Sequence, residues 1–335
     1  MVKRLHIELS TRCQASCPMC ARNHSGGSVR NFVGPEDISF GQFKEWFTPS
    51  WLSDLEFFLA CGNYGDPVMN NDVLLILAYL REHNQHCEIS FHTNGSARNA
   101  KWWQQLAAII GKNGQVVLAI DGFAETHSKY RIGTNWQHVI NTADALIAGG
   151  VKVWADVLVF EHNRHEIDEL HKYLVDKGIV NVKIKTTRRF GGETEYAVAN
   201  GDVLRPAVSV PYRPMVEGPA YENWLASAVI DPKCQQSSGE IYVDVHGRVW
   251  PCCWIAESYT RMSDPDRGTA GWAKWSQREG AEIRQLVESS PPIYLADNAV
   301  DTAIKTYEDS LLTWKQAWNS SRKPCDCVLF CSKSH

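Results

Sequence analysis

Three cysteines stand close together near the start of the chain, in the segment CQASCPMC that spans Cys13, Cys17 and Cys20. They directly follow the apolar segment Leu5–Leu9, whose composition predicts a β-strand. Sites in α/β sheets form at the carboxyl ends of the strands, where one loop can wrap three thiolates around a metal centre. The spacing therefore predicts a metal site.

The number of thiolates helps to separate the kinds of metal centre. Structural zinc usually has four ligands, whereas this loop supplies three, and His24 is the nearest further candidate. A [4Fe–4S] cluster normally takes four thiolates, so three would leave one iron open for a substrate or cofactor. We interpret the loop as an iron–sulfur site; a zinc loop or three structural cysteines are the alternatives.

The CxxxCxxC pattern after the first strand resembles the signature of the radical S-adenosylmethionine (SAM) superfamily. The resemblance implies a [4Fe–4S] cluster on Cys13, Cys17 and Cys20 whose open iron chelates SAM. One electron would cleave SAM to a 5′-deoxyadenosyl radical, which would abstract a substrate hydrogen. The resemblance also implies that Met19, at a position that is usually aromatic in the family, packs near the adenine.

The turn after the second predicted strand, CGNYGDP, resembles the Gly-Gly-Glu-Pro motif of the same superfamily. The resemblance implies that Gly65, Asp66 and Pro67 hold the amino group of SAM. Aspartate stands where the family has glutamate, and its carboxylate can still accept from an ammonium group. An ordinary glycine turn is the alternative.

Two further strand ends resemble family patterns. The turn HTNG, with Asn94, closes the third predicted strand, and AIDG followed by YR resembles a Ser-Ile-Asp-Gly … Arg pattern that includes Asp121 and Arg131. The resemblance implies SAM contacts at these positions, with Arg131 paired to the SAM carboxylate. A solvated surface arginine is the alternative. No catalytic acid or base is identified, although Glu161, His162, Lys185 and Arg188 lie near predicted strand ends.

A second group of cysteines lies near the end of the chain. Cys234 precedes a glycine by thirteen positions, Cys252 follows that glycine by five, and the tail CDCVLFC adds three more cysteines. This resembles the SPASM and Twitch domains of the superfamily. It implies one auxiliary [4Fe–4S] cluster on Cys234, Cys252, Cys327 and Cys331, with Cys325 or Cys253 as substitutes. Four thiolates also suit zinc, so a zinc knuckle is the alternative.

Strand and helix patterns alternate through the first half of the chain. The predicted strands are Leu5–Leu9, Leu55–Ala60, Glu88–His92, Val116–Ile120, Val151–Phe160 and Val182–Thr186. The predicted helices are Phe40–Phe47, Asp72–Glu82, Asn99–Ile110, Trp136–Ala148 and Arg164–Lys177. Six alternations imply an α/β fold with a parallel sheet, either flat or an open barrel. The family resemblance implies a partial (β/α)6 TIM-like barrel.

We divide the chain into three parts. Residues 1–195 form the predicted core barrel, residues 196–230 a proline-punctuated linker or bridging segment, and residues 231–335 a small cysteine-rich auxiliary domain. Within the last part, alternation through Ile241, Val243 and Val245 before a turn at His246–Gly247 predicts a β-hairpin.

Composition excludes several classes of partner. The formal net charge of −4 and the pI of about 6.3 give no electrostatic footprint for nucleic acid or an anionic membrane. No apolar run is long enough to span a bilayer, and the N-terminus lacks the apolar region of a signal peptide. We therefore expect a cytoplasmic protein, in which eleven cysteines favour metal sites over disulfides.

Two kinds of function follow from these patterns. The first is an enzyme that uses SAM, a reductant such as flavodoxin or ferredoxin, and a small-molecule or peptide substrate. The chain starts almost directly at the first strand, without an N-terminal peptide-recognition domain, which favours a small substrate or a separate carrier. The second is a non-enzymatic iron–sulfur or zinc protein that acts as a scaffold or carries electrons.

Overall fold

The computed structural model describes residues 2–187, 189–190, 193–208, 226–232, 239–262 and 283–320, and the single residues 219, 223, 323, 327 and 331. Two predicted metal ligands, Cys234 and Cys325, lie outside the described residues, as does Arg188, which was noted only as near a predicted strand end. So does part of the predicted linker, whose first, described part contains a small antiparallel pair, β7 (Tyr196–Ala197) and β8 (Val203–Leu204).

A nine-stranded sheet in the order β11-β10-β9-β1-β2-β3-β4-β5-β6 organises the molecule. Strands β1 to β6 pair in parallel with their neighbours, which confirms the predicted α/β fold with a parallel sheet. Among the described strands, β6 and β11 end the order, so the sheet is open, as a partial barrel requires. The six strands are β1 Arg4–Ile7, β2 Phe57–Ala60, β3 Glu88–Thr93, β4 Gly114–Ala119, β5 Lys152–Val159 and β6 Asn181–Thr186.

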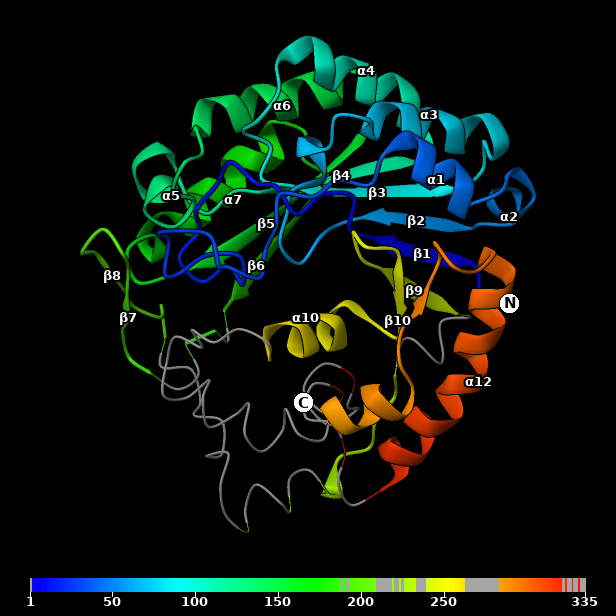
Figure 1. Ribbon diagram of the computed structural model, residues 1–335. Helices are drawn as coiled ribbons and strands as arrows, with labels where there is room; N and C mark the ends of the chain where they lie inside the picture. The colour runs from blue at the N-terminus through cyan, green and yellow to red at the C-terminus, as the bar shows by residue number, and fades with distance from the viewer. Residues whose placement is uncertain are drawn as a thin grey trace.

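Helices connect successive strands and lie along one face of the sheet, as Figure 1 shows for α3, α4 and α6. The connecting helices are α1 Phe40–Trp46, α2 Pro49–Ser53, α3 Val73–His83, α4 Ala100–Ile110, α5 Ala124–Tyr130, α6 Trp136–Ala148 and α7 Ile167–Asp176. The connections between strands and helices include the 3₁₀ turns η1 Pro67–Met69 before α3, η2 Gly111–Asn113 after α4 and η3 Arg164–Glu166 before α7. The short helices α2 and α5 were not predicted, because five and seven residues carry too little periodicity.

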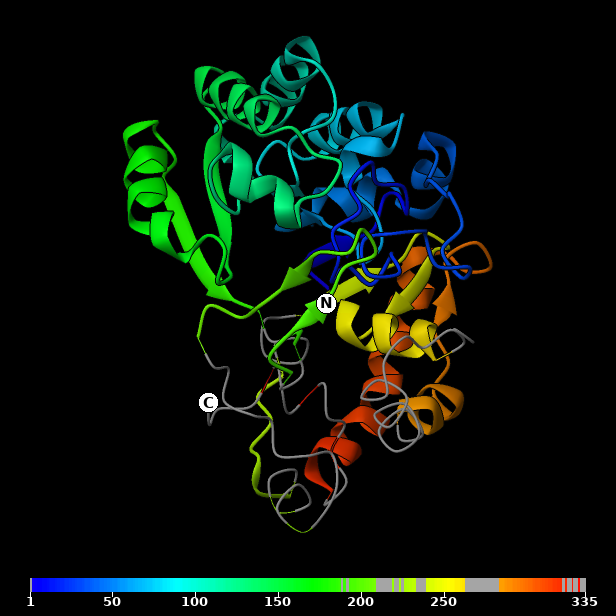
Figure 2. The same cartoon turned by 90° about the vertical axis from the view of Figure 1, so that its left-hand side faces the viewer.

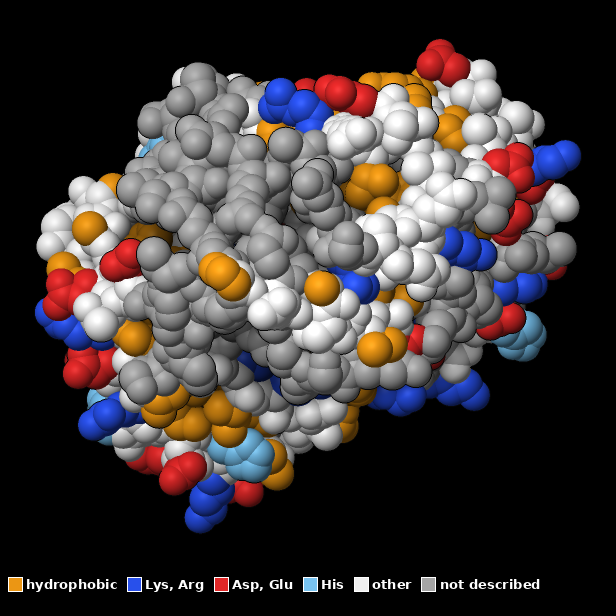
Figure 3. All heavy atoms as spheres, turned by 90° about the horizontal axis from the view of Figure 1, so that it is seen from below, with side chains coloured by type: hydrophobic (Ala, Val, Ile, Leu, Met, Phe, Trp, Pro, Cys, Tyr) orange, Lys and Arg blue, Asp and Glu red, His pale blue; other side chains and the backbone are white. Residues whose placement is uncertain are grey.

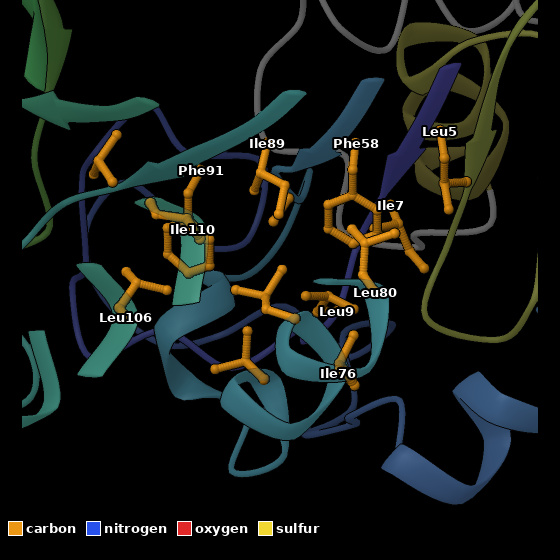
Figure 4. Close-up of a cluster of buried hydrophobic side chains, with 14 of the residues drawn as sticks. Leu5, Ile7, Leu9, Phe58, Ile76, Leu80, Ile89, Phe91, Leu106 and Ile110 are labelled. Carbon is orange, nitrogen blue, oxygen red and sulfur yellow. The ribbon is translucent and has the colours of Figure 1, made fainter. Parts of the chain in front are cut away.

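The main hydrophobic core lies between the sheet and these helices. Figure 4 shows Leu5, Ile7 and Leu9, which alternate along β1 and its continuation, pointing toward the same layer as Ile76 and Leu80 of α3. All five side chains are almost completely buried. Because side chains alternate along a strand, His6 and Glu8 project from the opposite face. We call that face, which points away from α3, α4 and α6, the inner face of the sheet.

The predicted β-hairpin is present as β9 (Glu240–Val243) and β10 (Arg248–Trp250), and β11 (Ile293–Tyr294) extends it. Strand β9 also pairs in parallel with β1 over all four of its residues. The C-terminal hairpin is therefore part of the main sheet, and β1 is an interior strand of that sheet.

Helices α10 (Cys253–Arg261) and α12 (Val300–Asn319) belong to the C-terminal part, where residues 283–289 are also helical. Helix α10 lies on the side of the sheet opposite α3, α4 and α6 (Figures 1 and 2). The longer helix α12 contributes Val300, Ala303 and Tyr307 to the main core. No helix in the described ranges is long and apolar enough to cross a membrane. Seen from below, lysine and arginine side chains lie interspersed with aspartate and glutamate around the edge of the molecule (Figure 3).

Candidate functional site

The loop after β1 holds the first cysteine group in a packed environment. Cys17 is buried, and Cys13 and Cys20 are partly buried beside Met19 and Tyr130 in a small hydrophobic cluster. The backbone N–H of Cys20 donates to the carbonyl of Cys17 at 3.0 Å. The three thiols form no disulfide within the described residues, so they are available as ligands.

Two polar donors approach these sulfurs, one just after β3 and one at the C-cap of α5. Asn94 Nδ2 lies 3.7 Å from Cys13 Sγ, and Arg131 Nη1 lies 3.9 Å from Cys17 Sγ. Burial raises the pKa of Cys17 to about 11 and raises the pKa of Cys13 further. The bare thiols of Cys13 and Cys17 therefore hold their protons, and a bound metal centre would be needed to deprotonate them.

The residues present fit a cluster with one open iron. Within the described ranges, no three His, Cys, Asp or Glu side chains are arranged around a single metal ion. A [4Fe–4S] cluster binds each thiolate at a different iron, so its ligands need not meet at one point. Hydrogen-bond donors near the sulfurs stabilise negative charge there and tune such clusters. Cys13, Cys17 and Cys20 would be the three thiolate ligands of such a cluster.

Asp66 connects the loops that follow β2 and β3. Its Oδ2 accepts from Thr93 Oγ1 at 2.9 Å, from the Asn94 backbone N–H at 2.8 Å and from Asn94 Nδ2 at 2.6 Å. Burial raises the pKa of Asp66, and the hydrogen bonds from Asn94 and Thr93 oppose that shift. Its Oδ1 accepts from the N–H of Val68 at 3.2 Å, which starts the 3₁₀ turn at Pro67. Asp66 thus orients Asn94, whose amide reaches Cys13.

Gly65 is required by a close approach of two loops. A Cβ at this position would lie 1.9 Å from the carbonyl oxygen of Ser10. The next residue donates its backbone N–H to the carbonyl of Arg12 at 2.9 Å. The loop after β2 therefore lies directly against the loop that carries the cysteines.

Arg131 and Asp121 form a buried ion pair. Arg131 Nε donates to Asp121 Oδ2 at 2.6 Å, and the other carboxylate oxygen accepts from the N–H of Leu158 at 2.7 Å. The side chain of Arg131 is 16% exposed and that of Asp121 is 0% exposed, which excludes a solvated surface arginine. Burial alone lowers the pKa of Arg131, but Asp121 and Cys17 raise it, and the net shift is upward. The guanidinium therefore stays charged beside the cysteine loop.

An aromatic group adjoins the cysteines. The ring centroids of Phe160 and Tyr130 lie 4.6 Å apart. Phe160 also stacks on His162, with ring centroids 5.3 Å apart and an angle of 11° between the ring planes. His162 Nε2 is buried and has no hydrogen-bond partner within the described part of the chain. Met19 is buried, and its backbone carbonyl accepts a hydrogen bond from Arg189 Nη1 at 2.9 Å.

The inner face of the sheet carries a group of ionisable residues, of which the sequence analysis noted only Lys185. Lys185 on β6 donates to Asp156 Oδ2 on β5 at 2.6 Å, while the buried Asp156 Oδ1 has no partner within the described ranges. Burial lowers the pKa of His92 on β3 to about 4, and Asp156 opposes that shift. Of the four residues noted near strand ends, Lys185 joins this group, and Glu161 faces Arg205 at the surface.

Glu8 on the same face was also missed. It is 1% exposed, and burial raises its pKa to about 7. A signal was present, because His6 and Glu8 are polar residues at alternate positions in an otherwise apolar strand.

Four cysteines of the C-terminal part are described. Cys252 is the N-cap residue of α10, and Cys253 begins that helix. Cys327 is buried, and its Sγ accepts from Trp318 Nε1 at 3.3 Å. Cys331 accepts through its backbone carbonyl from the N–H of Asp231 at 2.6 Å.

Comparison with solved structures shows a shared fold at low sequence identity. The structure resembles anSMEcpe with bound AdoMet at 14% identity and a TM-score of 0.53, over 95% of this chain and 94% of that one. It resembles anSMEcpe with bound AdoMet and Cp18Cys peptide at 15% identity and a TM-score of 0.51, over 94% and 97%. It resembles Streptococcus suis SuiB bound to precursor peptide SuiA at 14% identity and a TM-score of 0.51.

This last match covers 77% of this chain but 61% of SuiB, so the chain spans about three fifths of that protein. A search of curated proteins finds no match. The profile of the Radical SAM superfamily matches residues 7–174, half of the chain, and this range contains the three-cysteine loop, Asp66 and Arg131. The chain therefore belongs to the Radical SAM superfamily.

Proposed function

We propose that this protein reductively cleaves SAM to a 5′-deoxyadenosyl radical that abstracts a hydrogen atom from a substrate. The observation that carries the proposal is the approach of Asn94 and Arg131 to the sulfurs of Cys13 and Cys17. Two residues expected to contact SAM thus lie next to residues expected to bind the cluster. When bound, the reduced [4Fe–4S] cluster supplies the electron for cleavage.

The chain's own residues have separable roles in this proposal. Cys13, Cys17 and Cys20 supply thiolates. Arg131, held by its buried ion pair, offers a fixed guanidinium to the SAM carboxylate. Asp66 orients the loop ends that meet the amino group of SAM, together with Gly65, Pro67 and Asn94. Met19 and the aromatic group around Phe160 offer an apolar surface to the adenine.

We place the substrate against the inner face of the sheet. There Lys185, Asp156 and His92 provide an ammonium group, a carboxylate oxygen without a partner, and an imidazole kept neutral by burial. These groups suit a polar substrate, and the unpartnered carboxylate oxygen of Asp156 offers an acceptor for a proton released during oxidation. SuiB and anSMEcpe have been crystallised with peptides, and we propose a peptide or a small polar molecule here.

We further propose that residues 231–335 include a SPASM- or Twitch-like site for one auxiliary [4Fe–4S] cluster. Its ligands would be Cys234, Cys252, Cys327 and Cys331, with Cys325 or Cys253 as substitutes. Residues 196–230 would bridge this site to the core in residues 1–195. A flavodoxin or ferredoxin in the cytoplasm would supply electrons.

Anaerobic reconstitution with iron and sulfide, followed by dithionite and SAM, tests the proposal. We expect 5′-deoxyadenosine from the wild-type protein and none from the Cys17→Ala variant. Cys87→Ala is the matched control, because Cys87 is buried in the main core and lies outside the loop. Tight zinc binding without SAM cleavage would favour the non-enzymatic scaffold instead. Full activity in Cys17→Ala would refute the ligand assignment.

A further inference from the structure

The loop formed by residues 61–66 contacts the C-terminal part of the chain directly. Asn63 Nδ2 donates to the carbonyl of Cys253 at 2.8 Å, and Tyr64 Oη donates to the carbonyl of Glu257 at 3.4 Å. Both acceptors belong to α10. Two hydrogen bonds thus connect this loop to a helix that lies about 190 residues later in the sequence.

Glu8 fastens the same loop from the sheet. Its Oε1 accepts from the backbone N–H of Tyr64 at 2.7 Å, and its Oε2 accepts from Tyr242 Oη on β9 at 3.1 Å. Glu8 and Tyr242 are each 1% exposed, so both hydrogen bonds are shielded from water. A single carboxylate therefore joins β1, the loop and the C-terminal hairpin.

The loop has little room to move between its two supports. A Cβ on Gly62 would lie 2.6 Å from Glu8 Oε1, and a Cβ on Gly65 would lie 1.9 Å from the Ser10 carbonyl. The loop is therefore held between Glu8 on one side and the cysteine-bearing loop on the other. A change at Glu8 must displace the segment that leads to Asp66.

We propose that Glu8 is a positioning residue for SAM binding, which fixes the loop 61–66 against the C-terminal segment β9–α10 through Tyr64 and Tyr242. Full SAM affinity then requires that segment to be docked on the barrel. The inference rests on the proposed function, because it takes the loop 61–66 as part of the SAM site. It adds that this site is completed by residues 239–262, which lie outside the matched superfamily range.

Equilibrium binding of SAM to the anaerobically reconstituted full-length protein tests the proposal. We expect Glu8→Ala to raise the Kd for SAM about tenfold or more, because two buried donors lose their acceptor. Glu8→Gln retains a carbonyl acceptor for Tyr64 and an amide that can donate to Tyr242 Oη, so its Kd should stay within about threefold of the wild type. Iron content, measured alongside, should be the same in all variants.

Glu36→Gln is the matched control. Glu36 pairs with His246 Nδ1 at 2.9 Å and so also bridges the barrel and the C-terminal hairpin, but its carboxylate does not touch the loop 61–66. We expect its Kd for SAM to equal that of the wild type. An equal rise in Glu36→Gln and Glu8→Ala would overturn the proposal, because it would show a general effect of the interface.

Smaller substitutions keep the test decisive if Glu8→Ala does not fold. Tyr242→Phe removes one hydroxyl group, and Asn63→Ala removes the bond to α10. Each should raise the Kd about threefold or more with unchanged iron content. Wild-type Kd values in both variants, while the wild type still forms 5′-deoxyadenosine, would overturn the positioning role and leave the proposed function intact. Absence of 5′-deoxyadenosine from the wild type would instead refute the proposed function itself.

Discussion

The buried ion pair between Asp121 and Arg131 gives the sharpest prediction for stability. Asp121→Asn keeps an acceptor for the N–H of Leu158 but removes the charge that neutralises the guanidinium. Breaking a buried pair by removing one partner costs about 3–5 kcal/mol. At about 2.1 cal/mol/K of unfolding entropy per residue, a chain of 335 residues would then show a fall in Tm of roughly 4–7 °C.

The assay is thermal unfolding of the reconstituted protein, followed by circular dichroism under anaerobic conditions. The matched control is Asp144→Asn. Asp144 pairs with Lys177 at 2.7 Å, but its side chain is 54% exposed. Exposed pairs contribute about 0–1 kcal/mol, so the control should change Tm by less than about 2 °C. Equal shifts in the two variants would show that the pair between Asp121 and Arg131 behaves as an exposed one, and would refute the reasoning.

Three further predictions follow from the geometry. Gly65→Ala should abolish SAM binding, measured by equilibrium dialysis, because its Cβ would overlap the Ser10 carbonyl at 1.9 Å; binding at wild-type affinity would contradict the close approach. The pKa of Glu8 rises from 4.5 to about 7 on folding, so the folded state binds the carboxyl proton more tightly than the unfolded state does. The protonated carboxyl therefore stabilises the folded state at low pH, and this stabilisation is lost as pH rises through 7. Denaturant unfolding at pH 5 and pH 8 should therefore show a loss of about 2–3 kcal/mol in the wild type that Glu8→Gln lacks. Lys185→Met should leave 5′-deoxyadenosine formation in the absence of substrate unchanged but reduce its stimulation by substrate, and full stimulation would exclude the ion pair with Asp156 from the substrate site.

Local patterns predicted most of the strands and helices of the barrel. The helix predicted at Trp136–Ala148 has those bounds in the structure, because its apolar stripe is long and Asn135 caps it. The third predicted strand extends one residue further, to Thr93. Such elements carry their periodicity within a few consecutive residues, so one sequence suffices to locate them.

Long-range pairing was not predictable in this way. Strand β9 pairs with β1, more than two hundred residues away in the sequence. The alternation of apolar residues within β9 predicts a strand but does not indicate with which other strand it pairs. The role of Glu8 depends on that pairing, since its partner Tyr242 belongs to β9. The sequence likewise left open whether the side chain of Arg131 is exposed or buried, because its environment is set by Asp121 and the cysteine loop.

The position of β1 between β2 and β9 has a consequence for synthesis of the chain. On the ribosome, β1 emerges more than two hundred residues before its partner β9. During that interval, the backbone groups of β1 that later pair with β9 form an open strand edge, which is prone to pairing with other chains. The cysteine loop that follows β1 is anchored to a finished sheet only after translation has passed β9. Cluster insertion should therefore follow the synthesis of β9, and a circular permutant that places β9 directly before β1 should shorten the exposed interval.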